Sequence, residues 1–193
     1  MMTDVRFSDS SARITAALLD AGFEAYYVGG CVRDRMRGVP AHDVDIATNA
    51  KLDDICRLFP RAKVVGKAFS VALVDDVEVA SFRVDGPYSD YRHPDYVRLD
   101  VSRDEDLARR DFTINAMALS PDGDLVDLFE GRADLSRRVI RFVGDAAKRI
   151  TEDPIRALRA CRFVGLIDGT LDTDARDAIR HHHDLLDHVP RER

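Results

Sequence analysis

A glycine pair and an Asp-x-Asp lie close together near the N-terminus, within the segment VGGCVRDRMRGVPAHDVDIAT. Gly29 and Gly30 predict a tight turn whose backbone amides face phosphate oxygens, and a helix expected to begin at Cys31 adds its positive N-terminal dipole. Asp43 and Asp45 fall in a predicted short strand, where side chains two residues apart share one face. Two carboxylates beside a phosphate-binding turn are what a Mg²⁺-assisted attack on a nucleoside triphosphate requires.

Each of these features has a simpler interpretation when it stands alone. A Gly-Gly is commonly only a turn, and an Asp-x-Asp is commonly a solvated loop or a helix cap. In this chain both occur together at short spacing, with Arg33 between them. The combination favours a nucleotide site over the simpler interpretations.

Two further groups of charged residues lie beside apolar runs. Glu78 is part of VEVASFR, a predicted strand from which its side chain would join Asp43 and Asp45; a solvated edge position is the alternative. In RRDFTINAMA, strong charges directly precede an apolar run, which predicts the rim of a pocket. There Arg110 would contact phosphate or sugar, and Asp111 would accept a hydrogen bond from a ribose hydroxyl. A surface ion-pair cluster at a helix end is the alternative.

A last group recurs at every third position of EDPIRALRACRF: Asp153, Arg156, Arg159 and Arg162. On a predicted helix these neighbours drift by about 60° at each step, because one turn takes 3.6 residues. The two ends of the stripe therefore serve different targets. Asp153 and Arg156 offer an acceptor and a fork of donors to a base edge. Arg159 and Arg162 suit phosphate contacts or structural ion pairs.

The expected order of elements places these groups in an α/β region, of α+β type, followed by helices. Helices are expected at 8–21, 31–37, 52–59 and 104–109, and strands at 23–28, 43–47, 62–65, 69–74, 77–84, 116–119, 125–128 and 139–142. Asp75-Asp76 predicts a tight hairpin. Residues 85–103 lack periodicity and are expected to form a mobile loop over the active site, an inert insertion being the alternative. From 143 the spacing is helical, with helices expected at 146–150, 154–166 and 172–187, the second beginning with Pro154 behind an Asp153 cap.

Bulk properties restrict the class of protein. The chain has 193 residues, 45% of them hydrophobic, and carries a net charge of −6, which argues against a surface coated by nucleic acid. No apolar run is long enough for a membrane span, and the N-terminus lacks the features of a signal peptide. The cysteines are far apart and form no C-x-x-C pair, as in reducing compartments. These features predict a cytoplasmic protein without membrane contact.

Taken together and in order, these motifs strongly resemble those of the class II tRNA nucleotidyltransferase and bacterial poly(A) polymerase family. The matching pieces are VGGCVRD with its DVD pair, VEVASFR, RRDFTINAMA and EDPIRALRACRF. The resemblance covers about residues 25–165, and the combination of motifs is specific although no single piece is. It implies a polymerase-β-like head with a mixed or antiparallel sheet over residues 1–142. It further implies an all-helical neck over residues 143–193.

The resemblance also implies the reaction, which is addition of CMP and AMP from CTP and ATP to the 3′ end of tRNA. The resemblance implies that Asp43 and Asp45 bind Mg²⁺ and that Gly30 and Arg33 contact the triphosphate. It implies that Arg110 and Asp111 lie at the sugar and phosphates. Asp153 and Arg156 would form the protein template that pairs with the base, with Arg159 and Arg162 nearby.

Several alternatives stay open at this point. VGKAFSVALV and YSDYRHPDYV are more similar to CCA-adding members, but a poly(A) polymerase or an enzyme that adds only CC or only A has similar motifs. The chain stops at VPRER, where a further neck motif is expected, which indicates a truncated protein. A nucleotide-binding module without RNA turnover is therefore the alternative of another class. The sequence does not determine the oligomeric state.

Overall fold

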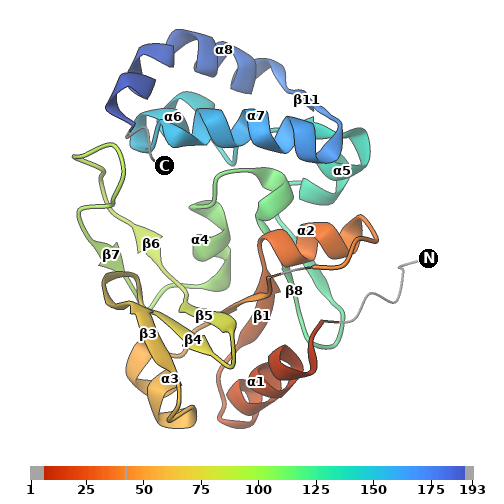
Figure 1. Cartoon of the computed structure of the whole chain (residues 1–193), viewed down its shortest axis with the longest axis vertical. Helices are drawn as coiled ribbons and strands as arrows, with labels where there is room; N and C mark the ends of the chain where they lie inside the picture. The colour runs from red at the N-terminus through yellow and green to blue at the C-terminus, as the bar shows by residue number, and fades with distance from the viewer. Residues whose placement is uncertain (1–6, 42, 190–193) are drawn as a thin grey trace.

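A seven-stranded sheet forms the centre of the computed structural model, which describes residues 7–41 and 43–189 (Figure 1). Its order is β3-β4-β5-β2-β1-β8-β9. These strands are β1 (Ala25–Val28), β2 (Asp45–Thr48), β3 (Lys63–Gly66), β4 (Val71–Val74), β5 (Val77–Ser81), β8 (Met117–Leu119) and β9 (Leu125–Asp127). β2 and β5 are parallel and the other neighbours are antiparallel, so the prediction of a mixed sheet is confirmed.

Helices α1, α2 and α3 pack on this sheet, and α6, α7 and α8 form a separate group. The helices are α1 (Asp9–Asp20), α2 (Gly30–Met36), α3 (Leu52–Leu58), α4 (Arg103–Ala108), α5 (Gly131–Arg137), α6 (Ala146–Glu152), α7 (Ile155–Ile167) and α8 (Thr173–His181), with short 3₁₀ turns η1 (Lys67–Phe69), η2 (Thr113–Asn115) and η3 (His183–His188). Figure 1 shows α6, α7 and α8 together at one end of the molecule and α1 and α3 at the other. Among the described residues, no helix is long and apolar enough to cross a membrane.

Local sequence signals account for several element ends. The Ser8 side chain accepts a hydrogen bond from the Ser11 amide at the start of α1, and Gly22 follows the helix with a φ of 84°. The hairpin predicted at Asp75-Asp76 joins β4 and β5, and both residues have positive φ, 46° and 64°. Such a two-residue turn matches the twist of the strands that it connects.

Two of the three apolar clusters among the described residues differ in their position relative to the predicted boundary between head and neck. The first lies between the sheet and helices α1, α2 and α3. It includes Leu18, Val32 and Ile55, whose side chains are fully buried. The second joins Phe112 and Phe142 to residues of α6, α7 and α8. The second core thus contains side chains from both sides of the boundary predicted after residue 142, and that boundary stays a prediction.

The last predicted strand of the sheet, 139–142, is wrong in its placement. β10 (Val139–Ile140) pairs in parallel with β11 (Thr170–Leu171), outside the seven-stranded sheet. α7 ends at Ile167, its C-cap residue Asp168 adopts the left-handed conformation, and the Thr170 amide then donates to the Arg138 carbonyl at 2.9 Å. The region after residue 142 is therefore helical except for β11, which corrects the prediction of an all-helical neck. Spacing alone did not reveal this strand because its partner lies about thirty residues earlier.

Smaller differences concern the ends and gaps of elements. The helix expected at 172–187 divides into α8 and η3. The strand expected at 77–84 divides into β5 and a short β6 (Val84–Asp85), which pairs with β7 (Val97–Arg98) inside the expected loop. α5 was not predicted, since its sequence GRADLSR is too polar to show a helical period.

Candidate active site

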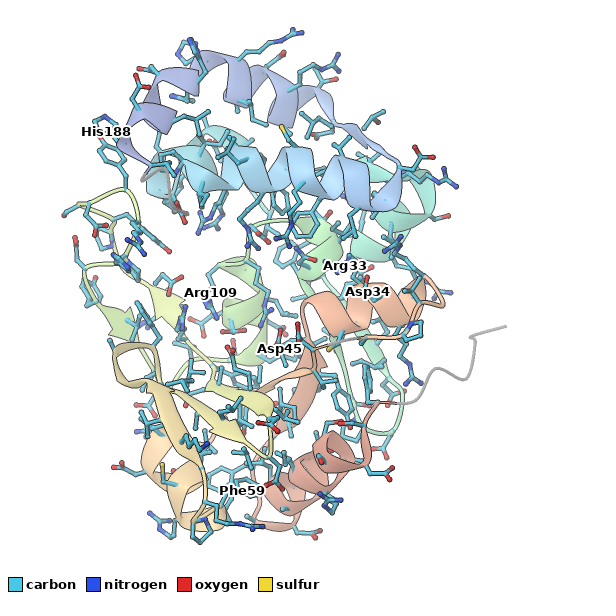
Figure 2. All side chains as sticks on the ribbon, in the orientation of Figure 1. Arg33, Asp34, Asp45, Phe59, Arg109 and His188 are labelled. Carbon is cyan, nitrogen blue, oxygen red and sulfur yellow. The ribbon has the colours of Figure 1, made fainter. Side chains whose placement is uncertain are left out.

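A cleft of about 900 Å³ lies between the sheet and α7 and gathers the residues that the motifs singled out. In Figure 2, Arg33 and Asp34 on α2, Asp45 at the start of β2 and Arg109 after α4 surround this region. Every predicted site residue except Glu78 is among those that line it, which are Gly29, Gly30, Arg33, Asp34, Asp43, Asp45, Arg109, Arg110, Asp111, Asn115, Asp153, Ile155, Arg156, Leu158, Arg159, Arg162 and Phe163.

The glycine turn connects β1 to α2 at the floor of the cleft. Gly29 has a φ of 71°, a conformation that residues with a Cβ rarely adopt. A Cβ at this position would lie 3.4 Å from an Arg110 Nη1 and 3.5 Å from an Asp45 Oδ2. The turn therefore brings bare backbone against one cationic and one anionic side chain, and its contact with phosphate stays a prediction.

The two aspartates flank this turn but do not share a strand. β2 begins at Asp45, and Asp43 is exposed and precedes the strand, which corrects the prediction that both lie in it. Asp45 is opposite Glu78 of β5 in parallel register, so their side chains point to the same face of the sheet. Burial, followed by the charge of Glu78, raises the pKa of Asp45 to about 6; Arg110 opposes this rise and Asp43 adds to it.

This excess of negative charge fits a divalent cation. Relief of carboxylate repulsion favours the bound ion, and Mg²⁺ in particular is commonly held by one or two carboxylates with water and substrate phosphates as its other ligands. Among the described residues, no group of three or more His, Cys, Asp or Glu side chains has the arrangement of a metal site. The structure thus brings Asp43 and Asp45 to the cleft and leaves Glu78 outside its lining.

Arg33 is fixed on the opposite side of the turn by residues that sequence reasoning missed. Its Nη1 donates to Asn115 Oδ1 at 2.9 Å, and its Nε and Nη2 donate to Asp34 at 3.0 and 2.8 Å. Only 7% of Arg33 is exposed. Asp34 directly follows Arg33, and Asn115 is the polar residue inside the apolar part of RRDFTINAMA. These two sequence positions are the features that could have identified Asp34 and Asn115 as partners of Arg33.

Asp106 of α4 holds the pair of arginines at the rim. The carboxylate is 2% exposed and accepts hydrogen bonds from Arg109 Nη2 at 2.8 Å, from Arg110 Nη2 at 3.0 Å and from the Arg83 amide at 3.2 Å. Burial by itself would raise the pKa of Asp106, but Arg109 and Arg110 lower it below its ordinary value. Among the described residues, the buried Arg110 Nε has no hydrogen-bond partner.

Asp106→Asn is expected to lower the free energy of unfolding by about 3–5 kcal/mol at pH 7, because it leaves two half-buried guanidiniums, those of Arg109 and Arg110, without their buried carboxylate. A lowered pKa means that ionised Asp106 stabilises the fold above the ordinary value of 3.8 and loses this contribution as pH falls through the folded-state pKa. The difference between the two proteins should therefore shrink below pH 4. Urea unfolding between pH 7 and pH 3 measures it.

Asp104→Asn is the matched control, since Asp104 lies on the same helix with its side chain 51% exposed and pairs with Arg103. Its exposed ion pair contributes at most about 1 kcal/mol. Equal losses in the two variants, or an Asp106 loss that does not vary with pH, would contradict the assignment of Asp106 as the buried charge partner.

An ion pair joins the rim to α7. Arg159 Nη2 lies 2.6 Å from Asp111 Oδ2, and Asp111 Oδ1 accepts from the Phe112 amide at 2.8 Å and from Asn115 Nδ2 at 3.3 Å. Asp111 is thus tied to the helix that carries the proposed template residues. The ribose contact expected for Asp111 stays a prediction.

At the N-terminal end of α7, Arg156 is held in place by two acceptors. It is 8% exposed, and its Nη1 donates to Glu152 at 2.6 Å and to the Arg149 carbonyl at 3.0 Å. α7 begins at Ile155 with Pro154 as its N-cap, one residue later than predicted, and Asp153 Oδ1 accepts from the Ile155 amide at 3.2 Å. Asp153 and Arg156 both line the cleft, as expected for an acceptor and a donor that face one ligand.

The segment between β6 and β7 reaches from the sheet toward α7 and α8 (Figure 1). The Tyr88 hydroxyl donates to Asp85 at 3.0 Å, and the Arg156 guanidinium lies 5.7 Å from the centre of the Tyr88 ring. At the far end, Tyr91 stacks on His188 with ring centroids 5.0 Å apart. The predicted position beside the site is confirmed by the Arg156 contact, and the predicted mobility stays a prediction.

Comparison with known proteins agrees with this geometry. The Poly A polymerase head domain model matches residues 25–141. The CCA-adding enzyme of Lactobacillus delbrueckii subsp. bulgaricus is 41% identical over 199 aligned residues that cover 100% of this chain and 50% of the relative. The CCA-adding enzyme of Geobacillus stearothermophilus is 44% identical over 93% of this chain and 46% of its own length. This chain therefore spans about half the length of the curated relatives that it matches.

Solved structures show the same similarity. The Bacillus stearothermophilus CCA-adding enzyme in complex with CTP superposes with a TM-score of 0.85 and 39% identity, over 94% of this chain and 45% of that one. A tRNA nucleotidyltransferase complexed with a primer tRNA and an incoming ATP analog gives a TM-score of 0.72 and 30% identity, over 92% of this chain and 52% of that one. Because the family model matches residues 25–141, more than half of the chain, this chain belongs to the Poly A polymerase head domain family.

Proposed function

We propose that this chain is the catalytic part of a tRNA nucleotidyltransferase that adds C, C and A to the 3′ end of tRNA, using CTP and ATP. The observation that carries the proposal is one cleft that contains both the aspartates beside the glycine turn and the pair Asp153 and Arg156 at the start of α7. Similarity to CCA-adding enzymes supports CCA addition over the other reactions. We divide the chain into a head, residues 1–142, and a neck, residues 143–193, and we propose that it acts in the cytoplasm.

Asp43 and Asp45 would hold the metal, for which we propose Mg²⁺. Bound there, the ion would lower the pKa of the RNA 3′-hydroxyl and would neutralise charge on the departing pyrophosphate. Asp45 is the better placed of the two, since its Oδ2 would lie 3.5 Å from a Cβ at Gly29, whereas Asp43 is exposed and precedes β2. Glu78 is proposed as a third acidic contributor that acts through its charge on Asp45.

The glycine turn and the arginines would bind the rest of the nucleotide. Gly29 and Gly30 would present backbone to the triphosphate, Arg33 lies beside them, and Arg110 Nη1 would lie 3.4 Å from a Cβ at Gly29. The RNA 3′ oxygen then attacks the α-phosphorus, the bond from that phosphorus to pyrophosphate breaks, and the hydroxyl proton leaves to solvent. Asp111 would accept a hydrogen bond from a ribose hydroxyl.

The choice of base would depend on Asp153 and Arg156. Cytosine and adenine each present an exocyclic amine donor next to a ring-nitrogen acceptor. A carboxylate accepts from the amine and a guanidinium donates to the ring nitrogen, so one pair of side chains can read both bases without a nucleic-acid template. Glu152 and the Arg149 carbonyl fix one edge of the Arg156 guanidinium, which directs its remaining donors.

Primer extension tests the proposal. tRNA ending at the discriminator base, at C or at CC is incubated with Mg²⁺ and with CTP, ATP or both, and a reaction with EDTA is the control. Ordered addition of C, C and A followed by arrest is the expected result. Runs of A on any 3′ end would instead identify a poly(A) polymerase, and addition of only CC or only A a partial enzyme. CTP binding without any extension would identify a nucleotide-binding module.

A further inference from the structure

The Phe163 side chain lies where α7 meets the head, and its ring contacts three guanidinium groups. Phe163 is 2% exposed and packs edge-on against Phe112, with ring centroids 5.3 Å apart. The central guanidinium carbons of Arg33, Arg159 and Arg162 lie 5.2, 5.6 and 5.3 Å from the centroid of the Phe163 ring. These distances are within the range of about 6 Å at which the face of an aromatic ring attracts a cation.

Two of these arginines are also neutralised by carboxylates. Arg33 comes from α2 in the head and pairs with Asp34 at 2.8 Å. Arg159 comes from α7 and pairs with Asp111 at 2.6 Å. The Phe163 ring therefore links an arginine of the head to an arginine of α7, which are far apart in the sequence and which would repel each other without intervening charge or π density.

Arg162 differs from the other two. It is exposed, and among the described residues it forms no ion pair, so the Phe163 ring is what holds its guanidinium near Arg33 and Arg159. A long arginine side chain without such a contact samples many rotamers and loses them all when it binds a ligand. A guanidinium that is already held against a ring loses less on binding phosphate.

We propose that Phe163 is a positioning residue that gathers Arg33, Arg159 and Arg162 into one cationic wall for the triphosphate of the incoming nucleotide. The inference rests on the proposed function, because that function supplies the triphosphate. All four side chains line the same cleft as Asp45. The ring itself is buried, so it acts through the arginines and does not stack on the base.

Phe142 supplies a matched control from the same core. It is 3% exposed and contacts the same Phe112 ring at 4.8 Å, and among the described residues no guanidinium lies against it. Phe163→Leu and Phe142→Leu should therefore lose similar thermal stability, because each removes one buried ring from one cluster. Only Phe163→Leu removes the support of the arginines.

Calorimetric titration of the whole chain with CTP, with inorganic tripolyphosphate and with cytidine tests the proposal, at a temperature where both variants are folded by circular dichroism. Phe163→Leu is expected to raise the Kd for CTP and for tripolyphosphate by about tenfold, equivalent to ~1.4 kcal/mol. The Kd for cytidine should not change, since cytidine carries no phosphate. Phe142→Leu should leave all three values within about twofold of those of the unmodified chain.

Equal weakening in both variants, or no weakening in Phe163→Leu, would overturn the inference. If Phe163→Leu does not fold, Phe163→Met replaces it, because the flexible thioether fills the space without a ring. A chain that binds CTP and tripolyphosphate but extends no tRNA would refute the proposed function and leave the role of Phe163 to be judged by these Kd values. A chain that binds neither ligand would overturn the inference itself.

Discussion

Asp45→Asn is expected to lower the rate of CMP transfer at saturating CTP by at least about a thousandfold, because a carboxylate that holds a catalytic metal contributes several kcal/mol to the transition state. Asp45 is the first residue of β2, directly beside the Gly29 turn that is proposed to carry the triphosphate. The Kd for CTP measured with EDTA should not rise, since the change removes a negative charge from the neighbourhood of the phosphates. Single-turnover extension and calorimetry give the two values.

Stability separates a chemical defect from an unfolded chain in this experiment. The pKa of Asp45 is raised to about 6, so in the metal-free chain its ionisation weakens the fold as pH rises from 3.8 through 6. Asn at this position should therefore raise the melting temperature at pH 7 and change it little below pH 4. A more stable but inactive variant is the expected combination.

Asp76→Asn is a suitable control for the Asp45 variant. Asp76 lies in the hairpin between β4 and β5 with a φ of 64°, a conformation that Asn adopts readily, so neither rate nor stability should change. An Asp45→Asn variant that retains more than about a tenth of the rate would show that this carboxylate does not hold the catalytic metal.

Arg156→Ala is expected to reduce discrimination among nucleotides by about tenfold to a hundredfold, the effect of losing a hydrogen bond that costs 1–3 kcal/mol. Arg156 is buried and held by Glu152 and by the Arg149 carbonyl, so its free donors have a defined direction. Without them, the choice between CTP and ATP should blur and UTP and GTP should be accepted more readily. Competition between nucleotides in primer extension measures the ratios of kcat/KM.

The fold should tolerate this change, because Glu152 keeps its ion pair with Arg149 at 2.9 Å. Arg156→Lys is the informative companion, since it retains the charge beside Glu152 but not the planar fork of donors. Selectivity lost in both variants indicates reading of the base edge. Unchanged selectivity with a uniformly higher KM for all nucleotides would assign Arg156 to phosphate binding and refute the template role.

The sequence by itself determined the features that depend on neighbouring residues. The positive φ required at Gly29, the hairpin at Asp75-Asp76 and the Ser8 cap follow from intrinsic backbone preferences, which act over a few residues. Hydrophobic periodicity likewise predicted most strands and helices of the head. The ordered motifs identified the family because their chemistry is carried by residue types at short spacing.

Only the tertiary structure decided which distant residues share a contact. Pairing of β10 with β11 and the ion pair between Asp111 and Arg159 each join segments tens of residues apart. Polar side chains such as Asn115 are equally compatible with solvent or with a buried partner until the chain folds around them. The Phe163 ring showed in the sequence only as one more apolar residue of a helix. Its contacts with guanidinium groups from two parts of the chain depend on packing, which periodicity does not encode.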